Sequence, residues 1–226
     1  MIFFVDAANR TPFAADIVSM HRQRKAVFVD HARWKVPVIA DQEIDRFDLL
    51  EDTLYLLAKD EPAGPLLASA RLLPTSGPHL MQELYCESHR TGIPCGRKVW
   101  EASRFCTAAE IAGRNKRLNL LWQIICAVME NALARGIDQV IFAANRALLP
   151  LALNCGWDAS IVGPTQKDGE DEFTAVAAAV TLQGLRSIRA RYGIAAPITF
   201  PPDGSHGSGP APVPPRLQPL ERASAP

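Results

Sequence analysis

The sequence predicts a mixed α/β fold, in which one central sheet carries helices on both of its faces. Strand-like segments dominate the first part of the chain, and helical and strand-like segments alternate after that. The composition agrees, because 48% hydrophobic residues in a chain of 226 can fill one full core. We therefore expect a single globular domain over residues 1–195.

The first half of the chain begins the expected sheet. Residues 1–5 read as a strand, and residues 12–32 carry apolar side chains at helical spacing. The apolar segments 53–59 and 65–73 flank a short stretch rich in acidic residues, Pro and Gly, which is typical of a hairpin. This half therefore places one early helix among several strands.

The second half alternates between helices and strands. Helical periodicity over residues 115–135 stops at a glycine, which suits the left-handed position after a helix. A buried strand at 139–144 and a short helix at 147–154 follow. The composition of residues 172–180 fits a strand or a helix, and we favour a strand that leads into a helix through residue 192.

A change of composition marks the end of the predicted domain. From about residue 197 the chain is rich in Pro, Gly, Ala and Ser, which bury too little apolar surface to offset the entropy of ordering. We expect residues 196–226 to form a flexible tail. The N-terminus resembles no signal peptide, and no apolar stretch is long enough to span a bilayer. A cytoplasmic location without a membrane partner is therefore expected.

Charge and cysteine content narrow the function classes. Lys and Arg together number 24, as do Asp and Glu, so the chain lacks the basic excess of a nucleic-acid-binding protein. The five cysteines are odd in number and show no Cys-x-x-Cys spacing, which favours reduced thiols. Cys86, His89 and Cys95 match no common zinc spacing. We therefore expect neither a nucleic-acid partner nor a metal.

The apolar, strand-like segment at residues 99–107 carries one carboxylate, Glu101, and one guanidinium, Arg104. In a regular strand, positions three apart face opposite sides. A β-bulge between them would turn both charges to one side, and bulges are frequent beside active sites. Buried charges are costly unless they pair with each other or with a ligand. Taken alone, this pair fits a structural ion pair better than a functional one.

Similar isolated charges recur upstream. Arg24 lies near the apolar side of the first predicted helix, Asp45 and Asp48 would share one helical turn, and Arg71 interrupts an apolar strand. Buried ion pairs are close to neutral for stability, so a core does not need so many. Together the charges favour a site for a ligand that carries both signs of charge. Aromatic faces for a cation or an adenine ring would come from Phe28, Trp34 and Trp100.

In order and spacing, these fragments resemble the acyl-homoserine lactone synthases, also called autoinducer synthases. The resemblance covers most of the predicted domain and implies an N-acyltransferase-like (GNAT) fold. In that fold, two parallel strands splay apart to admit an acyl-pantetheine thioester. The fragments that carry the resemblance are Arg24-x-x-Val-Phe28, Trp34, Asp45-x-x-Asp48, Arg71-Leu-Leu-Pro-Thr75 and Trp100-Glu-x-Ser-Arg-Phe105.

The resemblance also implies the reaction and its partners. S-adenosylmethionine and an acyl group on acyl carrier protein or coenzyme A would give N-acyl-homoserine lactone, 5′-methylthioadenosine and the free carrier thiol. Since S-adenosylmethionine is a substrate here, no cofactor is expected. The residues expected to bind it or to organise its pocket are Arg24, Phe28, Trp34, Asp45, Asp48, Arg71, Glu101 and Arg104.

The residue types fit this chemistry. The substrate amine must lose a proton before it attacks the thioester, and Glu101 is the first candidate for the base, supported by Asp48 or Asp45. Backbone N–H groups freed by a bulge would stabilise the oxyanion. Arg71 or Arg104 would hold the substrate carboxylate through a bidentate contact. Because the amine attacks directly, the chemistry needs no Ser or Cys nucleophile.

The acyl donor would enter beside a basic helix start. Coenzyme A acetyltransferases carry a glycine-rich loop here, whereas this chain has Arg114, Lys116 and Arg117 where a helix N-terminus attracts anions. We interpret these residues as a docking patch for a phosphopantetheine arm or an acidic carrier protein. A solvated helix start fits them equally well. The missing glycine loop favours acyl carrier protein over coenzyme A.

The acyl chain would run between the strand of Trp100 and the strand at 139–144. The same apolar residues also fit an ordinary core. Family members that make 3-oxo products tend to carry a hydroxyl on the second strand, and its alanines favour an unsubstituted chain. The expected walls are Met81, Leu118, Leu121, Trp122, Ile125, Phe142, Ala143 and Ala144.

Two other functions stay open at the level of the sequence. An N-acyl amino acid synthase of the same fold would use another amine; it explains the shared strand motif but not the full set of Asp45, Asp48 and Arg71. A catalytically idle acyl-binding or regulatory protein would lack one of the six charges, and none is missing.

Overall fold

The computed structural model contains one large mixed sheet, and it describes residues 1–85, 92–168, 171–194 and 198–200. Short 3₁₀ turns, η1 (Thr11–Phe13) and η3 (Arg46–Leu49), and a π-helical segment, η2 (Lys25–His31), accompany the regular elements. The strands and α-helices are β1 (Ile2–Val5), α1 (Ala14–Arg24), β2 (Val38–Ile39), β3 (Gln42–Glu43), β4 (Leu54–Lys59), β5 (Leu66–Pro74), α2 (Met81–Leu84), β6 (Val99–Thr107), α4 (Arg114–Ala134), β7 (Gln139–Asn145), α5 (Leu149–Asn154), β8 (Ala159–Asp168), β9 (Asp171–Ala179), α6 (Leu182–Tyr192) and β10 (Thr199–Phe200).

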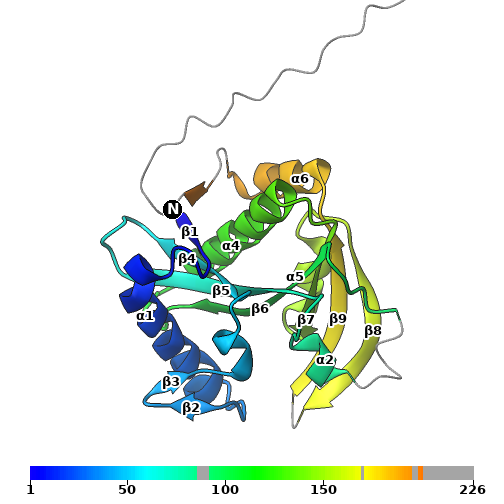
Figure 1. The fold of residues 1–226 in the computed structure, drawn as a ribbon. Coiled ribbons are helices and arrows are strands. Elements are labelled where there is room, and N and C mark those ends of the chain that lie inside the picture. Colours follow the sequence, from blue (N-terminus) through cyan, green and yellow to red (C-terminus); the bar gives the residue numbers. More distant parts are fainter. Residues whose placement is uncertain (86–91, 169–170, 195–197, 201–226) are drawn as a thin grey trace, which may run out of the picture.

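The sheet has eight strands within the described ranges, in the order β10-β1-β4-β5-β6-β7-β9-β8 (Figure 1). Strands β1 and β10 pair in parallel, as do β6 and β7, and every other neighbouring pair is antiparallel. A separate two-stranded hairpin, β2–β3, turns at Ala40 and Asp41, which both have positive φ. The predicted mixed α/β class is confirmed.

The parallel pair β6–β7 separates part-way along its length. Val99 pairs with Gln139, Trp100 with Val140 and Glu101 with Ile141. Among the described residues, the two strands form no pair beyond Glu101. Both strands continue beyond this point, β6 to Thr107 and β7 to Asn145. The gap between them begins beside Glu101. This is the splayed arrangement that the resemblance implied.

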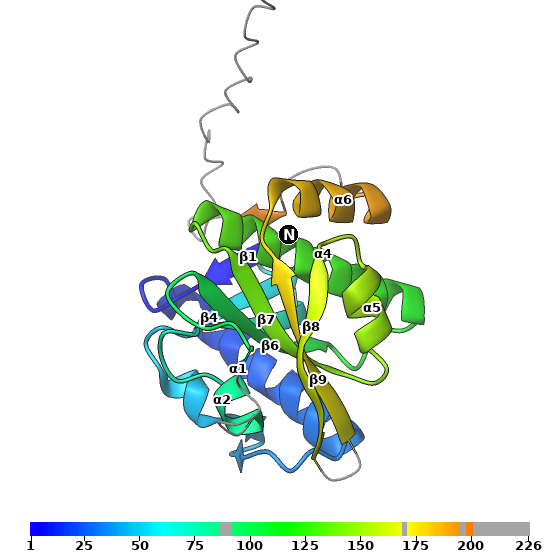
Figure 2. The same ribbon diagram turned by 90° about the vertical axis from the view of Figure 1, so that its right-hand side faces the viewer.

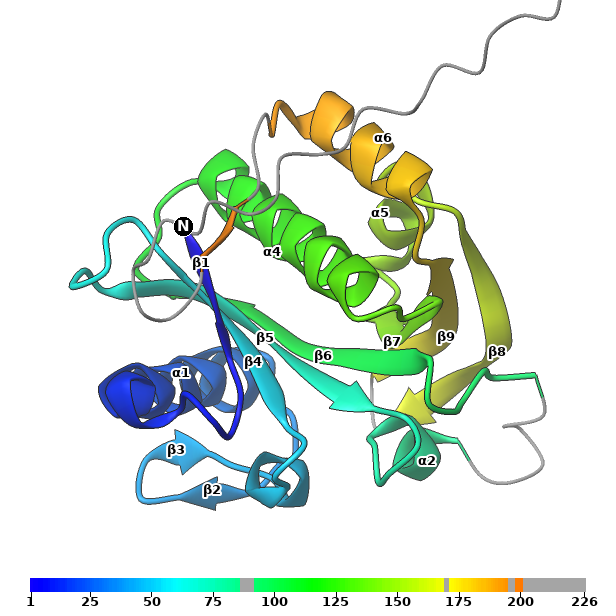
Figure 3. The same cartoon turned by 45° about the horizontal axis from the view of Figure 1, so that its top comes forward.

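Helices cover both faces of the sheet. Helices α4, α5 and α6 lie on one face, whereas α1, the β2–β3 hairpin and α2 lie on the other (Figures 2 and 3). The larger apolar cluster fills the α4 side, and two smaller ones pack on the α1 and α2 side. Because strand residues alternate between faces, each strand contributes to both layers. The charged site described below occupies the α1 face.

The predicted first helix is divided into segments of different winding. Residues 12–32 begin with the 3₁₀ turn η1, continue as α1 and end in the π-helical segment η2. A π-helical insertion changes the direction of the side chains that follow it, and such insertions are frequent at functional sites. Here it lies directly after Arg24 and carries Phe28.

Besides β2 and β3, two strands of the large sheet lie outside the sequence prediction. Strand β8 pairs with β9 at the sheet edge, and no element was predicted at residues 159–168. Strand β10 pairs with β1, and the Ile2 amide donates to the Ile198 carbonyl at 2.8 Å. The boundary predicted at residue 196 is therefore wrong, because the pairing of the last strand extends the domain to residue 200. Residues 201–226, where a tail was expected, lie outside the described residues.

Within the described part of the chain, no helix is both long enough and apolar enough to cross a membrane.

Candidate active site

Six buried charged side chains meet on the α1 face of the sheet. They come from the end of α1, from β3, from the start of η3 and from the neighbouring strands β5 and β6. Each carboxylate contacts at least two guanidiniums, so the charges form one connected group. We call this group the ion-pair network: Arg24, Arg71, Arg104, Glu43, Asp45 and Asp48.

Arg24 lies at the centre of the network and is fully buried. Its Nη1 and Nη2 donate to the two carboxylate oxygens of Asp48 at 2.8 and 2.9 Å, while Nε donates to Glu43. Burial alone would lower the pKa of Arg24, but the hydrogen bonds and charges of Asp48 and Glu43 raise it above its ordinary value. The guanidinium is therefore a permanent buried cation.

Asp45 and Asp48 are positioned by one turn of helix, as their spacing predicted. Asp45 is the N-cap of η3 and accepts from the Phe47 amide, while Asp48 accepts from the Asp45 amide at 2.9 Å. This reciprocal capping box fixes both carboxylates before any cation binds. Arg24 and Arg71 hold the pKa of Asp48 far below its usual range, although burial acts in the opposite direction.

Arg104 reaches the network because β6 contains a bulge. Ser69 pairs with Cys106 and Arg71 pairs with Ser103, so one residue of β5 opposes two residues of β6. Arg104 lies in this bulge with φ of 55°. Its Nη2 donates to Glu43 at 3.1 Å and to Asp45 at 2.9 Å. The predicted bulge is therefore present, and it places Arg104 on the same face as Glu101.

Arg71 completes the network from β5. Its Nη1 donates to Asp45 at 2.5 Å and to Asp48 at 3.1 Å, and its Nε donates to the hydroxyl of Ser103 at 3.2 Å. Its Nη2 is buried and meets no hydrogen-bond partner in the described residues. An unsatisfied buried donor is costly, so this nitrogen indicates a ligand acceptor.

Glu101 lies on the same face but outside the ion-pair network. It is buried, and its Oε2 accepts from the Met81 amide at 2.6 Å, at the start of α2. Its Oε1 is also buried and has no partner among the residues described. Burial raises the pKa of Glu101, and the Met81 amide and the charges of His79 and Arg71 offset this only in part. A carboxyl group with a raised pKa is suited to accept a proton.

The aromatic residues divide between the two faces. Phe28 and Trp34 stack with ring centroids 4.8 Å apart and planes 7° from parallel, and the Arg104 guanidinium lies 5.8 Å from the Phe28 ring. Trp100 instead faces α4 and stacks on Phe4. The expectation that Trp100 offers a face to the ligand is therefore wrong, because it precedes Glu101 on a strand whose side chains alternate.

Glu43 is a network residue that the sequence analysis did not select. It is fully buried, and its two carboxylate oxygens accept hydrogen bonds, one from Arg24 and the other from Arg104. The sequence contained one indication of this role: Glu43 lies two residues before Asp45, and alternate residues of an extended segment share a face. A lone Glu near a surface hairpin carried no sign of burial. Only the pairing of β2 with β3 turns it inward.

The residues expected along the acyl chain lie on both sides of the gap between β6 and β7. Met81 packs with Ile141 on the α2 face. Phe142 and Ala144 belong to the main cluster on the α4 face, and Trp122 and Ile125 pack against that cluster. Leu118 and Leu121 are half-buried on α4, and Ala143 is exposed. The expected residues therefore form no single wall, because neighbours on β7 face opposite sides.

The predicted basic patch lies at the start of α4. Arg114, Lys116 and Arg117 are all exposed. Arg117 donates to the Ile111 carbonyl at 2.8 Å and so also secures the preceding loop. Arg114 and Lys116 form no ion pair in the described ranges and are available to an anion.

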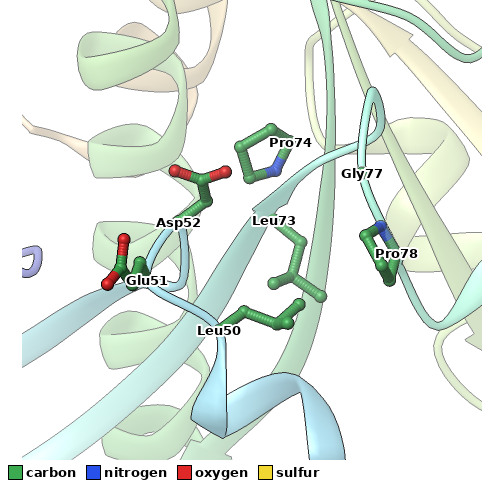
Figure 4. A pocket seen from close by; sticks show the side chains of 7 residues that line it. All are labelled: Leu50, Glu51, Asp52, Leu73, Pro74, Gly77 and Pro78. Carbon is green, nitrogen blue, oxygen red and sulfur yellow. The ribbon is translucent and has the colours of Figure 1, made fainter.

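A small pocket of about 100 Å³ opens beside the end of β5 (Figure 4). In the strand register its Leu73 lies opposite Glu101, so the pocket borders the site. Figure 4 shows the Asp52 carboxylate near Pro74, with the loop of Gly77 and Pro78 on the far side. The seven lining residues are Leu50, Glu51, Asp52, Leu73, Pro74, Gly77 and Pro78.

No group of three or more His, Cys, Asp or Glu side chains suited to a metal ion is present in the described segments. Of the three residues weighed as metal ligands, Cys86 and His89 lie outside those segments.

Comparison with known proteins decides the family. The family model described as autoinducer synthase matches residues 10–184. The chain belongs to the autoinducer synthase family. An acyl-homoserine-lactone synthase of Ralstonia nicotianae is 30% identical over 169 residues, which cover 72% of this chain and 81% of the relative. One of Pseudomonas aeruginosa is 29% identical over 158 residues, with 70% and 79% covered.

Solved structures of this autoinducer synthase family share the fold. MesI, a CoA-dependent acyl-homoserine lactone synthase, matches with a TM-score of 0.76 and 26% identity over 88% of this chain and 98% of its own. BjaI, solved with SAM and isopentyl-CoA, matches with a TM-score of 0.77 and 26% identity over 89% and 92%. An acyl-CoA N-acyltransferase of Pseudomonas aeruginosa, with 20% identity and a TM-score of 0.55, supports the GNAT-like fold.

Proposed function

We propose that this autoinducer synthase makes N-acyl-homoserine lactone from S-adenosylmethionine and an acyl thioester, and releases 5′-methylthioadenosine and the carrier thiol. One observation carries the assignment of the site. Arg71 Nη2 and Glu101 Oε1 are both buried and have no hydrogen-bond partner among the described residues, and they lie on neighbouring strands and on one face. A free donor on a cation and a free acceptor on an anion complement the carboxylate and the ammonium of an amino acid.

The first step is acyl transfer. The ammonium group of the substrate gives one proton to Glu101 and becomes a nucleophile. Its nitrogen then forms a bond to the thioester carbonyl carbon while the carbon–sulfur bond breaks, and its second proton leaves with the thiolate as a thiol. From Ala102 onward, β6 has no β7 neighbour in the described ranges. Its free N–H groups on that side are suited to stabilise the oxyanion.

The second step closes the lactone. The carboxylate oxygen attacks the carbon beside the sulfonium, and the carbon–sulfur electron pair leaves with 5′-methylthioadenosine. Because the sulfonium is already a good leaving group, the main requirement of this step is that the carboxylate oxygen is held close to the carbon that it attacks. Arg71, rigidly held by Asp45, Asp48 and Ser103, suits this task. The Phe28–Trp34 stack, beside Arg104, offers the aromatic face for the adenine or the sulfonium.

We propose acyl-CoA as the donor, in place of the carrier protein that the missing glycine loop favoured. MesI and BjaI are both CoA-dependent, and they match this chain with TM-scores of 0.76 and 0.77. The exposed Arg114 and Lys116 beside the splayed strands suit the phosphates of coenzyme A.

The experiment is a product assay with the purified full chain. S-adenosylmethionine is supplied with a series of acyl-CoAs or with the matching acyl carrier proteins, and methylthioadenosine and lactone are quantified by mass spectrometry. Lactone with equal methylthioadenosine supports the proposal, and the faster donor class identifies the carrier. Acylation of another amino acid without methylthioadenosine would instead identify an N-acyl amino acid synthase. Binding without any turnover would leave an idle acyl-binding protein.

A further inference from the structure

An exposed ion pair joins two elements of the site, and the mechanism above gives it no role. Arg46 of η3 contacts Glu83 of α2 through its Nη2 and the carboxylate Oε1. The two side chains are 66% and 42% exposed. Exposed ion pairs contribute little to the free energy of unfolding. Any larger effect of this pair must therefore come through the two elements that it joins.

On one side, Arg46 belongs to the turn that carries Asp45 and Asp48. The Cζ atom of Arg46 lies 5.0 Å from the centroid of the buried Phe47 ring, and the Cζ atom of Arg71 lies 5.4 Å from the same centroid. Arg46 thus packs on the same ring as Arg71, whose Nη2 has no partner in the described residues and suits the substrate carboxylate.

On the other side, Glu83 belongs to the short helix that holds Glu101. Helix α2 begins at Met81, whose amide donates to Glu101 Oε2 at 2.6 Å. The Glu83 amide donates to the Leu80 carbonyl at 2.9 Å, so Glu83 and Met81 lie in one hydrogen-bonded turn. A shift of Glu83 therefore moves the amide that fixes Glu101.

The pocket of Figure 4 lies between the segments adjacent to these two elements. Residues 50–52, which follow η3, line it from one segment, and Gly77 and Pro78, which precede α2, line it from the other. Among the described residues, Arg46 and Glu83 form the one ion pair that joins η3 to α2. Because the pocket separates the adjacent segments, packing alone does not fix the distance between the two elements.

We propose that Arg46 and Glu83 are positioning residues, whose ion pair fixes the separation of Arg71 Nη2 and Glu101 Oε1. The inference rests on the function proposed above. S-adenosylmethionine contacts both groups, through its carboxylate and its ammonium, so it binds most tightly where their separation is already correct. The thioester is placed against the N–H groups of β6 and does not join these two side chains. The ion pair therefore favours the binding of S-adenosylmethionine and not that of the acyl donor.

The test reverses each charge and then exchanges the two. Arg46→Glu and Glu83→Arg each replace attraction by repulsion, so we expect the KM for S-adenosylmethionine to rise about 10-fold. The KM for the fastest acyl donor and kcat should change less than about twofold, because bound S-adenosylmethionine itself joins Arg71 to Glu101. The double variant, with the pair exchanged, should return to within about threefold of the wild type. Equilibrium dialysis with S-adenosylmethionine measures the same change as a Kd, without turnover.

The sign of the change separates this role from a long-range charge effect. S-adenosylmethionine has a net positive charge, because its sulfonium adds to an ammonium and a carboxylate that balance. By charge alone, Arg46→Glu would lower the KM and Glu83→Arg would raise it. A site with a loosened separation raises the KM in both variants. Opposite changes, an unchanged KM in both, or a double variant with the summed defect of the singles would each overturn the proposal.

Controls separate positioning from a general structural defect. Lys167→Glu is the matched variant, because Lys167 forms an exposed ion pair with Glu172 on the β8–β9 hairpin, and its KM should equal that of the wild type. Thermal midpoints should stay within about 3 °C of the wild type. A lower midpoint with equal rises in both KM values would indicate a structural defect and overturn the proposal.

Two further outcomes complete the test. For a reversed variant that does not fold, Arg46→Gln serves in its place, with an expected rise of about threefold in the KM for S-adenosylmethionine; no rise overturns the proposal. An unchanged KM in variants of an active enzyme would overturn this inference alone. A wild-type enzyme that releases no methylthioadenosine would remove the proposed function as well.

Discussion

Asp48 and Glu101 are two buried carboxylates on the same face of the sheet, and their surroundings are opposite. Asp48 accepts from Arg24, Arg71, Tyr55 and a backbone amide. Burial raises its pKa, but Arg24, Arg71 and the Asp45 amide outweigh this and hold the pKa far below the usual range. Glu101 accepts from the Met81 amide, its other oxygen has no partner in the part of the chain that the structure describes, and burial raises its pKa.

The difference separates a carboxylate that holds the site together from one that can react. A fully paired carboxylate has little tendency to accept a proton, and its value is the geometry that it imposes on its partners. An unpaired buried carboxylate costs stability, and such groups persist where chemistry uses them. The ion-pair network therefore fixes the geometry of the site and positions the substrate, and Glu101 is the group that reacts with it.

We expect the largest effect from Glu101→Gln, which keeps the size of the side chain and removes the base. We expect turnover to fall by about 10²–10⁴-fold while the thermal midpoint stays the same or rises. Methylthioadenosine release and calorimetry measure the two effects. Glu110→Gln, at an exposed position, is the matched control. Turnover close to that of the wild type would remove Glu101 from the mechanism.

Asp48→Asn tests the other side of the comparison. The substitution removes one of the two anionic partners of Arg24 and one of the two of Arg71 in a buried place, so we expect a loss of about 3–5 kcal/mol in the free energy of unfolding. Denaturant titration measures this loss. Activity should fall with it, because Arg71 loses its fixed position. An unchanged unfolding free energy would contradict a structural role for the network.

The pH dependence of stability should have opposite signs at the two residues. The pKa of Asp48 is lowered by folding, so its contribution is present above its unfolded value near 4 and is lost as pH falls below that. The pKa of Glu101 is raised, so its ionisation opposes folding as pH rises above about 4.5. Glu101→Gln should therefore gain stability relative to wild type as pH rises above about 4.5. Parallel curves for the two proteins would refute this.

The smallest expected effect concerns the Tyr55 hydroxyl, which donates to Asp48 at 3.0 Å. Tyr55→Phe removes one of several donors to this carboxylate, and we expect a loss of about 1.5–2 kcal/mol in unfolding free energy. Tyr85→Phe is the control, because this buried hydroxyl meets no carboxylate among the residues that the structure describes, and it should cost less. Equal losses in the two variants would show that the hydrogen bond from Tyr55 to Asp48 adds nothing beyond the contribution of a buried hydroxyl without a carboxylate partner.

The sequence predicted most elements because their signals are local. The hairpin β4–β5 has turn residues between two apolar runs, and α4 ends at Ala134, two residues before Gly136, whose φ is 66°. Strand β8 was missed because its polar, mixed residues form a strand only by pairing with β9 at the sheet edge. Likewise β10 follows no pattern of its own and is held by β1 and by Glu130, which accepts from the amide of Thr199.

For the site, the sequence by itself determined which side chains are out of place: Arg71 and Glu101 are ionisable groups in apolar strands, and desolvation makes such positions costly wherever the strand is buried. Only the tertiary structure decided how the charges pair. It brought Glu43 inward, turned Trp100 away, and gave Asp48 several cationic and neutral donors, whereas Glu101 forms no ion pair with any cation in the described segments. The reason is physical: side-chain direction in a strand reverses with a single residue, and one bulge at Arg104 is enough to set it.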